Sequence, residues 1–513
     1  MAKLMVYKGI MFCVIAGIWA GGVQCFAVDT IAQKEQKSSS AAVYDLYPRN
    51  HSNELDMELF RLPAAEYRGT PFWSWNNKLD LQQLLRQLDC FKEMGFGGVT
   101  IHCRTGLDTE YMGPEFMQIV KVSTAKAKQL EMLTWLYDED RWPSGFAGGL
   151  VTKDEQYRAK QLRFTTKPND NSFDKSTLLA RYEVKLKNGY LDSYRLLKKD
   201  ETAAHSGKVW YAYLEPEASK TDPWFNNQTY VDVLSKKAIE RFLEVTHERY
   251  FSVIGNEFGK SVPAIFTDEP RYRRIEYLKQ PDEIRDICIP FTTDFFETYQ
   301  KAYKQKLGNH LPELFWELAE GKASLTRYRY YDHLCERFAA VFGDTIGRWC
   351  DSHNIALTGH SLAEETLGSQ TNRAGECMRF YRSFGIPGID MLCDRYEYNT
   401  AKQAQSAAHQ YGRGGVLSEL YGVTGWHFDF IGHKAHGDWQ AALGVTVRVP
   451  HLSWVSMAGE AKRDYPASIF YQSPWYREYK IIEDYFGRIN TVMTRGTPSV
   501  RIGVIHPVES YWL

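Results

Sequence analysis

Residues 133–149 read LTWLYDEDRWPSGFAGG, and the change from apolar to polar within this stretch points to the fold. Its first five residues, Leu133–Tyr137, have the apolar character of a short buried strand. Three acids, an Arg and a Trp follow at once, and Pro-Ser-Gly and Gly-Gly then indicate a loop. Functional residues often lie in loops directly after strands. The alternative is an ordinary strand exit whose charges pair with one another.

Short apolar strands recur along the chain, with amphipathic helical stretches between them. Residues 79–94, for example, have leucines at helical spacing. Such alternation implies parallel strands and an α/β fold, and eight strands predict a (β/α)8 TIM-type barrel over residues 56–495. An open doubly wound sheet is the alternative, but no Gly-rich phosphate fingerprint follows any strand. The predicted strands are Pro71–Trp75, Gly97–His102, Leu133–Tyr137, Val262–Phe266, Ile355–Gly359, Gly388–Leu392, Gly415–Glu419 and Gly444–Val449.

Two segments depart from this alternation. Residues 160–228 contain alternating polar and apolar runs and the turn signal Lys187-Asn188-Gly189, which predict a small antiparallel β insertion after strand 3. Near the other end, Val500–Pro507 is typical of the first strand of a further α/β domain, in residues 496–513. Only six residues follow Pro507, too few to complete a domain. We therefore expect a truncated sequence or a strand that docks elsewhere.

The N-terminus has the pattern of a signal peptide over residues 1–27. Lys3 and Lys8 precede an apolar run that is too short for a membrane span, and Ala27 suits cleavage. Gln24 disfavours lipid attachment at Cys25, because the residue before a lipidated cysteine is expected to be small. We therefore expect export to the periplasm or the outside of the cell, with a disordered leader over residues 28–55 and no transmembrane segment after cleavage.

The composition narrows the classes of partner. The formal net charge of −1 does not favour nucleic acid or an anionic membrane. The chain has 14 Trp and 32 Tyr, which suits a protein that handles sugars, although a large aromatic core explains this content equally well. The seven cysteines after the signal include no CxxC pair, so we predict buried free thiols and not a disulfide framework or a zinc site.

The predicted strand ends carry the side chains of a carbohydrate pocket, in which aromatic rings stack on sugars and polar groups bind hydroxyls. Barrel enzymes gather such residues at the C-terminal ends of their strands. We therefore predict an oligosaccharide or polysaccharide substrate. The predicted substrate-binding residues are Trp73, Trp75, His102, Arg104, Asp138, Asp140, Trp142, His360, Tyr421 and Trp426.

Two glutamates stand out as candidate catalytic residues. Glu269 follows the fourth predicted strand and Glu419 ends the seventh. Hydrolysis of a glycosidic bond needs one carboxyl group to protonate the leaving oxygen and a second to act as base or nucleophile. For Glu269 the alternative is a role near a helix start, where Thr267 and Asp268 would cap and Pro270 would be helical.

A metal site is the rival use of these acids. Asp138, Glu139 and Asp140 offer oxygen ligands for a hard cation such as calcium, although their spacing matches no known binding loop. No HExxH motif indicates zinc, and no GxSxG motif indicates an esterase.

Several motifs together resemble a group of exported bacterial glycoside hydrolase-like proteins, which is distantly similar to glycoside hydrolase family 106, the α-L-rhamnosidases. The motifs are PFWSWN at 71–76, Gly97-Gly98, YDEDRWPSG at 137–145 and FTDEP at 266–270, and the resemblance covers residues 60–510. It implies a (β/α)8 barrel, an inverting mechanism and calcium held by acids near the pocket. At the matching positions it implies Glu269 as general acid and Glu419 as general base.

The sequence therefore predicts an exported glycoside hydrolase that acts on plant or host glycans. Two other classes stay open. A non-catalytic glycan-binding protein would hold its carboxyl groups far apart or in buried ion pairs. A metal-dependent hydrolase would bring three or more acids or histidines around one point.

Overall fold

The computed structural model describes residues 45–50, 54–169, 175–198, 201–203, 207–217, 222–496 and 498–513. The predicted signal peptide lies outside these residues. The last part of the predicted leader, residues 28–55, is packed against the rest of the protein. Leu46 and Tyr47 are buried, and Tyr47 stacks on Tyr67. Among the described residues, no helix is both long enough and apolar enough to cross a membrane.

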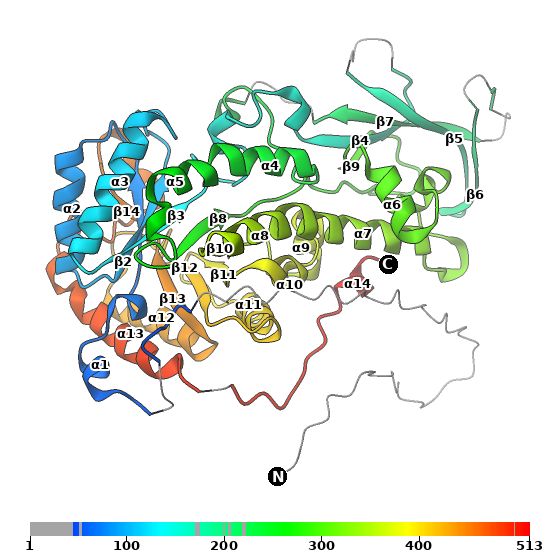
Figure 1. Cartoon of the computed structure of the whole chain (residues 1–513). Coiled ribbons are helices and arrows are strands. Elements are labelled where there is room, and N and C mark those ends of the chain that lie inside the picture. The colour runs from blue at the N-terminus through cyan, green and yellow to red at the C-terminus, as the bar shows by residue number, and fades with distance from the viewer. Residues whose placement is uncertain are drawn as a thin grey trace. The chain divides into compact units, whose positions relative to one another are not determined.

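Eight parallel strands form a barrel (Figure 1), as the sequence predicted. Each strand pairs with the next barrel strand along the chain. The eighth strand leads into the short strand β14 (Ser453–Trp454), which pairs in parallel with the first strand and closes the barrel. The bounds are β1 (Phe72–Trp75), β2 (Gly98–Cys103), β3 (Leu133–Tyr137), β8 (Ala264–Asp268), β10 (Ala356–His360), β11 (Ile386–Met391), β12 (Val416–Leu420) and β13 (Val445–Pro450).

Helices lie around the outside of the barrel (Figure 1). Their amphipathic pattern explains this position, since α2 buries Leu84, Leu88 and Phe91. The side chain of Asp80, directly before α2, caps the start of this helix. The bounds are α1 (Met57–Arg61), α2 (Leu81–Glu93), α3 (Pro114–Gln129), α4 (Lys236–Val245), α5 (His247–Ile254), α6 (Phe295–Tyr303), α7 (Leu325–Phe338), α8 (Asp344–Ser352), α9 (Leu367–Arg373), α10 (Cys377–Phe380), α11 (Tyr398–Gln410), α12 (Phe430–Ala442), α13 (Lys480–Met493) and α14 (Val508–Tyr511).

The two sides of β1 have different surroundings, and this corrects two predicted site residues. Phe72 points into the barrel and stacks on His102 at 4.2 Å between ring centroids. Trp73 and Trp75 point the other way, toward α2 and α3, and neither is exposed. The Trp73 indole donates a hydrogen bond of 2.7 Å to Gln87 of α2. Both tryptophans are therefore packed between strand and helices, where no sugar can stack on them.

A separate antiparallel sheet follows the third barrel strand, as predicted (Figure 1). It has five strands, and the fifth comes from beyond the predicted insertion, after barrel strand β8. This strand has four residues and pairs with β4, so sequence periodicity could not reveal it. The strands, in their order across the sheet, are β6 (Tyr190–Leu196), β5 (Thr177–Lys187), β7 (Lys208–Pro216), β4 (Lys160–Thr165) and β9 (Ile287–Pro290).

The last described residues do not form the predicted strand. Residues 498–507 have no regular structure, and Val504 is 89% exposed. The chain then forms the short helix α14, and Trp512 is buried against Tyr331 of α7. A strand needs a neighbouring strand for its backbone hydrogen bonds. This segment instead docks through the buried side chains of Val508 and Trp512.

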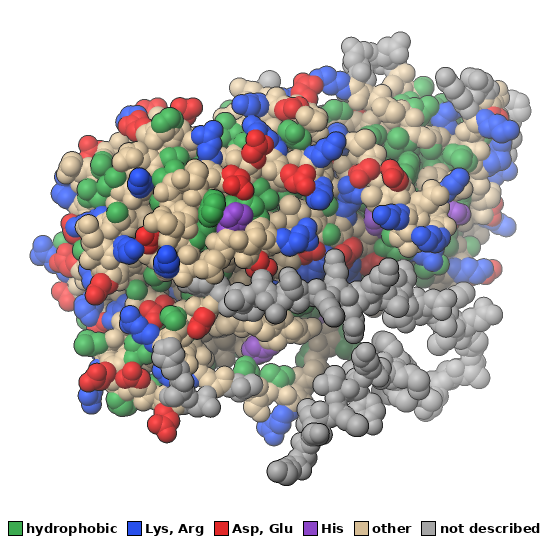
Figure 2. Space-filling model, in the orientation of Figure 1, with side chains coloured by type: hydrophobic (Ala, Val, Ile, Leu, Met, Phe, Trp, Pro, Cys, Tyr) green, Lys and Arg blue, Asp and Glu red, His purple; other side chains and the backbone are tan. Residues whose placement is uncertain are grey.

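The surface charge is mixed. On the face shown in Figure 2, Lys and Arg side chains alternate with Asp and Glu side chains, and no broad area carries one sign. This distribution agrees with the formal net charge of −1.

Candidate active site

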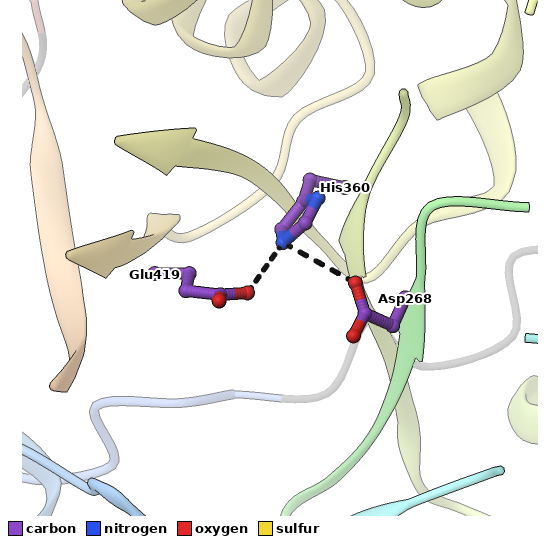
Figure 3. Close-up of side chains that lie close together, drawn as sticks. All are labelled: Asp268, His360 and Glu419. Atoms are coloured by element: carbon purple, nitrogen blue, oxygen red, sulfur yellow. Dashed lines mark hydrogen bonds and ion pairs between the residues drawn. The ribbon is translucent and has the colours of Figure 1, made fainter. Parts of the chain in front are cut away.

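Three side chains from three barrel strands meet inside the barrel (Figure 3). Asp268 ends β8, His360 ends β10 and Glu419 lies near the end of β12. His360 Nε2 lies 2.8 Å from Glu419 Oε2 and 3.8 Å from Asp268 Oδ1. The Tyr137 hydroxyl donates to Asp268 Oδ2 at 2.6 Å. Parallel pairing explains the grouping, because Asp268 and His360 are direct partners in the register of the sheet.

Three further acids lie near this group. Asp390 of β11 is the register partner of Glu419, Glu269 follows Asp268, and Glu364 lies in the loop after β10. Burial raises the pKa of all five carboxyl groups, and that of Glu364 to about 8. Neighbouring carboxylates raise the pKa of Glu269 further. Because each ionised carboxyl group raises the pKa of its neighbours, the five groups do not all ionise together at neutral pH, and some carry protons while others are carboxylates.

Glu269 differs from its neighbour Asp268 in direction and environment. Its backbone has a φ of 46°, in the left-handed region, directly after the strand. Its side chain is half-buried, whereas that of Asp268 is buried. The indole N–H of Trp142 donates a hydrogen bond to Glu269 Oε2. Strand alternation could have indicated that Asp268, two residues after Phe266, faces the barrel interior.

The loop after β3 uses its acids to hold its own backbone. Glu139 is fully buried and accepts hydrogen bonds from five backbone N–H groups of the loop. Asp138 is fully buried and accepts from the Ser144 hydroxyl at 2.5 Å. Asp140 pairs with Arg141 at 2.7 Å. The side chains of Asp138 and Asp140 thus contact groups of their own loop, which differs from the sugar-binding role predicted for them.

Calcium binding, the alternative use of residues 138–140, does not fit their arrangement, because their carboxylates are engaged separately. Among the described residues, the group of side chains that could hold a metal ion is Asp268, His360 and Glu419, with one ligand atom of each within 4.8 Å of the others. Calcium prefers a shell of oxygen atoms, and an imidazole nitrogen is foreign to it. Two carboxylates with one imidazole suit a transition metal better.

His102 and Arg104, both predicted to bind substrate, are held by protein partners. His102 is buried, its Nδ1 lies 3.1 Å from the Ser74 hydroxyl, and burial holds its pKa well below the ordinary value, so it is neutral. Arg104 donates two hydrogen bonds, of 2.7 and 2.9 Å, to Asp464 from the loop after β14. Asp464 lies 360 residues away in sequence, so no local pattern could reveal the pair.

The remaining predicted aromatic residues differ in accessibility. Trp142 is half-buried beside Glu269, and Trp426 is 41% exposed in the loop after β12. Tyr421 is fully buried, and its hydroxyl donates to the carbonyl oxygen of His433. Tyr421 is therefore a core residue, which corrects its predicted role.

Comparisons with known proteins bear on the fold. No protein-family model matches the chain, and no curated protein matches it. A solved structure of a rhamnosidase from Novosphingobium sp. PP1Y is similar over 86% of this chain, with a TM-score of 0.58 and 13% identity. This chain spans 60% of that rhamnosidase. A GH5_18 structure from Streptomyces cattleya covers 85% of this chain and 83% of its own length, at a TM-score of 0.36 and 10% identity.

An endo-β-1,4-mannanase from Thermotoga petrophila covers 82% of this chain and 78% of its own length, at a TM-score of 0.38 and 8% identity. At these identities, the likeness to the rhamnosidase establishes a shared fold.

Proposed function

We propose that this chain is a glycoside hydrolase in which Glu269 is the general acid and Glu419 the general base. The observation that carries the proposal is the cluster of five carboxyl groups with raised pKa values at the C-terminal ends of β8, β10, β11 and β12. Barrel enzymes place catalytic groups at this end. The likeness of fold to a rhamnosidase supports the same class of reaction.

The proposed reaction uses the two glutamates in different protonation states. Burial and neighbouring carboxylates raise the pKa of Glu269, so that it can carry the proton that the leaving oxygen receives. Glu419 accepts a proton from the attacking water as the water oxygen bonds to the anomeric carbon and the glycosidic bond breaks. His360, 2.8 Å from Glu419, orients this carboxyl group. An α-L-rhamnoside is the first substrate that we propose, with inversion at the anomeric carbon.

The experiment is hydrolysis of a panel of aryl glycosides, including α-L-rhamnoside, β-galactoside and α-L-arabinoside. We expect activity on one sugar that falls by a factor of about 10² or more in Glu269→Gln and in Glu419→Gln. Glu248→Gln is the matched control, because Glu248 also accepts an indole hydrogen bond, from Trp349, but on the outer helices. Activity that survives both changes would contradict the mechanism. NMR of the first product anomer distinguishes inversion from retention.

Two other functions remain candidates, each with a specific observation. The convergence of Asp268, His360 and Glu419 supports a metal-dependent hydrolase. Metal analysis of the purified chain, and activity after chelation and return of Zn²⁺, Mn²⁺ or Ca²⁺, test it. The exposed Trp426 supports a glycan-binding protein. A non-catalytic binding protein is expected to hold its carboxylates in buried ion pairs. Against this class, no Lys or Arg in the described part of the chain forms an ion pair with the five clustered carboxylates. Binding of oligosaccharide without hydrolysis would favour it.

We also propose that the chain works outside the cytoplasm, because residues 1–27 have the pattern of a signal peptide. Fractionation of cells that express the full chain, with N-terminal sequencing of the product, tests this. A product that keeps Met1 in the cytoplasmic fraction would contradict it.

A further inference from the structure

We propose that Trp142 is a positioning residue for Glu269, acting through its indole N–H and not through its ring face. The inference rests on the proposed function, in which Glu269 is the general acid. The indole N–H of Trp142 donates to Glu269 Oε2. The two residues come from different strand ends, β3 and β8, so this contact joins two loops of the barrel mouth. It assigns Trp142 a role different from sugar stacking.

The contact orients the carboxyl group because it engages one oxygen only. In the described part of the chain, Glu269 Oε1 makes no hydrogen bond, whereas Oε2 is held by the indole. The backbone N–H of Glu269 donates to the His360 carbonyl oxygen at 3.2 Å, which anchors the residue at its other end. A carboxyl group fixed at its backbone and at one oxygen presents the second oxygen in a defined direction. Proton transfer to a leaving group requires such a geometry.

Trp142 is itself held in place by residues of neighbouring segments, one of which is the insertion. Its carbonyl oxygen accepts a hydrogen bond of 2.6 Å from the indole N–H of Trp224, in the short helix Pro223–Phe225. The Arg271 guanidinium lies 6.0 Å from the Trp142 ring centroid and 5.4 Å from that of Tyr230. Tyr230 in turn donates to the Ser144 carbonyl oxygen, two residues after Trp142. Trp142 is therefore held at its carbonyl oxygen by Trp224, and its ring lies beside the Arg271 guanidinium.

The positioning role and the stacking role predict different kinetics. Trp142→Phe keeps an aromatic face and removes the N–H donor. If Trp142 positions Glu269, kcat falls by about tenfold or more, because misplacement of a reacting group by 1 Å costs up to about 10²-fold. KM then changes by less than about threefold, since ground-state binding is kept. If Trp142 only stacks on sugar, Trp142→Phe leaves kcat unchanged, and this result would overturn the proposal.

Two further variants make the kinetic test specific. Trp349→Phe is the matched control, because the Trp349 indole donates to Glu248 at 2.6 Å outside the barrel. It removes the same kind of hydrogen bond and should leave kcat unchanged. Trp224→Phe removes the donor to the Trp142 carbonyl oxygen at an exposed position and should lower kcat in the same sense, by less than Trp142→Phe. A Trp224→Phe chain with wild-type kcat would show that the insertion does not support Trp142.

A spectroscopic test does not depend on activity. In the chain labelled with ¹⁵N-tryptophan, the Trp142 indole signal is identified by its loss in Trp142→Phe. We expect Glu269→Ala to move this indole proton upfield, because its carboxyl acceptor is lost, and to leave the Trp349 signal in place. A Trp142 indole signal with the same chemical shift in Glu269→Ala as in the wild type would contradict the contact. A chain that shows the contact but hydrolyses no glycoside would contradict the proposed function and still support Trp142 as the residue that holds Glu269.

Discussion

Asp138 is a single carboxyl group whose burial makes stability depend on pH. It is fully buried, and burial raises its pKa from 3.8 to about 8, while the hydrogen bond from Ser144 opposes this increase. A folded-state pKa above the unfolded one means that the folded chain binds the proton more tightly. The contribution of Asp138 to stability is then complete below about pH 4 and is lost as pH rises toward about 8.

We predict that Asp138→Asn reduces this pH dependence, because an amide does not ionise. Relative to the wild type, the variant should gain stability between pH 5 and pH 8.5, by up to about 1.4 kcal/mol per pH unit for one proton. Urea unfolding followed by far-UV circular dichroism across this range measures it. A difference between variant and wild type that stays constant with pH would show that Asp138 does not titrate in this range.

At the scale of elements, the loop after β3 is organised around one side chain. Glu139 accepts five backbone N–H groups, four of them from residues 145–148. We predict that Glu139→Gln lowers the free energy of unfolding by about 2 kcal/mol or more, because an amide places N–H donors against N–H donors. Urea unfolding measures this loss. Glu240→Gln, at an exposed ion pair on α4, is the control and should cost less than about 1 kcal/mol.

A buried ion pair joins α13 to the barrel. Arg448 of β13 lies 2.7 Å from Glu483 of α13, both side chains are buried, and Glu483 also accepts the N–H of Gly69. We predict that Arg448→Met lowers the free energy of unfolding by about 3–5 kcal/mol, because it leaves an unpaired buried carboxylate. The double variant with Glu483→Gln should lose less than the sum of the two single changes, as denaturant unfolding would show. Additive losses would mean that the two charges do not depend on each other.

At the scale of the whole molecule, the acids at the barrel mouth act together. Asp390 is the carboxyl group that raises the pKa of Glu269 most, apart from burial. In the proposed mechanism Glu269 donates its proton as the acid, so activity should be lost as pH rises through its pKa. We predict that Asp390→Asn lowers that pKa and moves the alkaline limb of the kcat/KM profile to lower pH by about half a unit or more. If Asp390→Asn leaves the alkaline limb of the kcat/KM profile at the same pH, that limb reports the titration of a group other than Glu269.

The sequence was sufficient for the barrel but not for the direction of its side chains. Apolar runs separated by helical periodicity are a local property, and they placed all eight strands within a few residues of their observed bounds. In a barrel strand both faces are buried, one by the interior and one by helices, so both are apolar. Sequence could therefore not tell that Trp73 and Trp75 face α2 and α3 while Phe72 faces the interior.

The candidate site shows the same division. The sequence alone placed acids and aromatic residues at the strand ends, including Glu269, His360 and Glu419. Which of them meet depends on register and on contacts between segments far apart in the chain, such as Arg104 with Asp464 or Trp142 with Glu269. Only the tertiary structure turned Asp138, Glu139 and Asp140 inward to hold their own loop and brought Asp268 to His360. The physical reason is that residue type and spacing are local, whereas burial and hydrogen-bond partners are set by the packed chain as a whole.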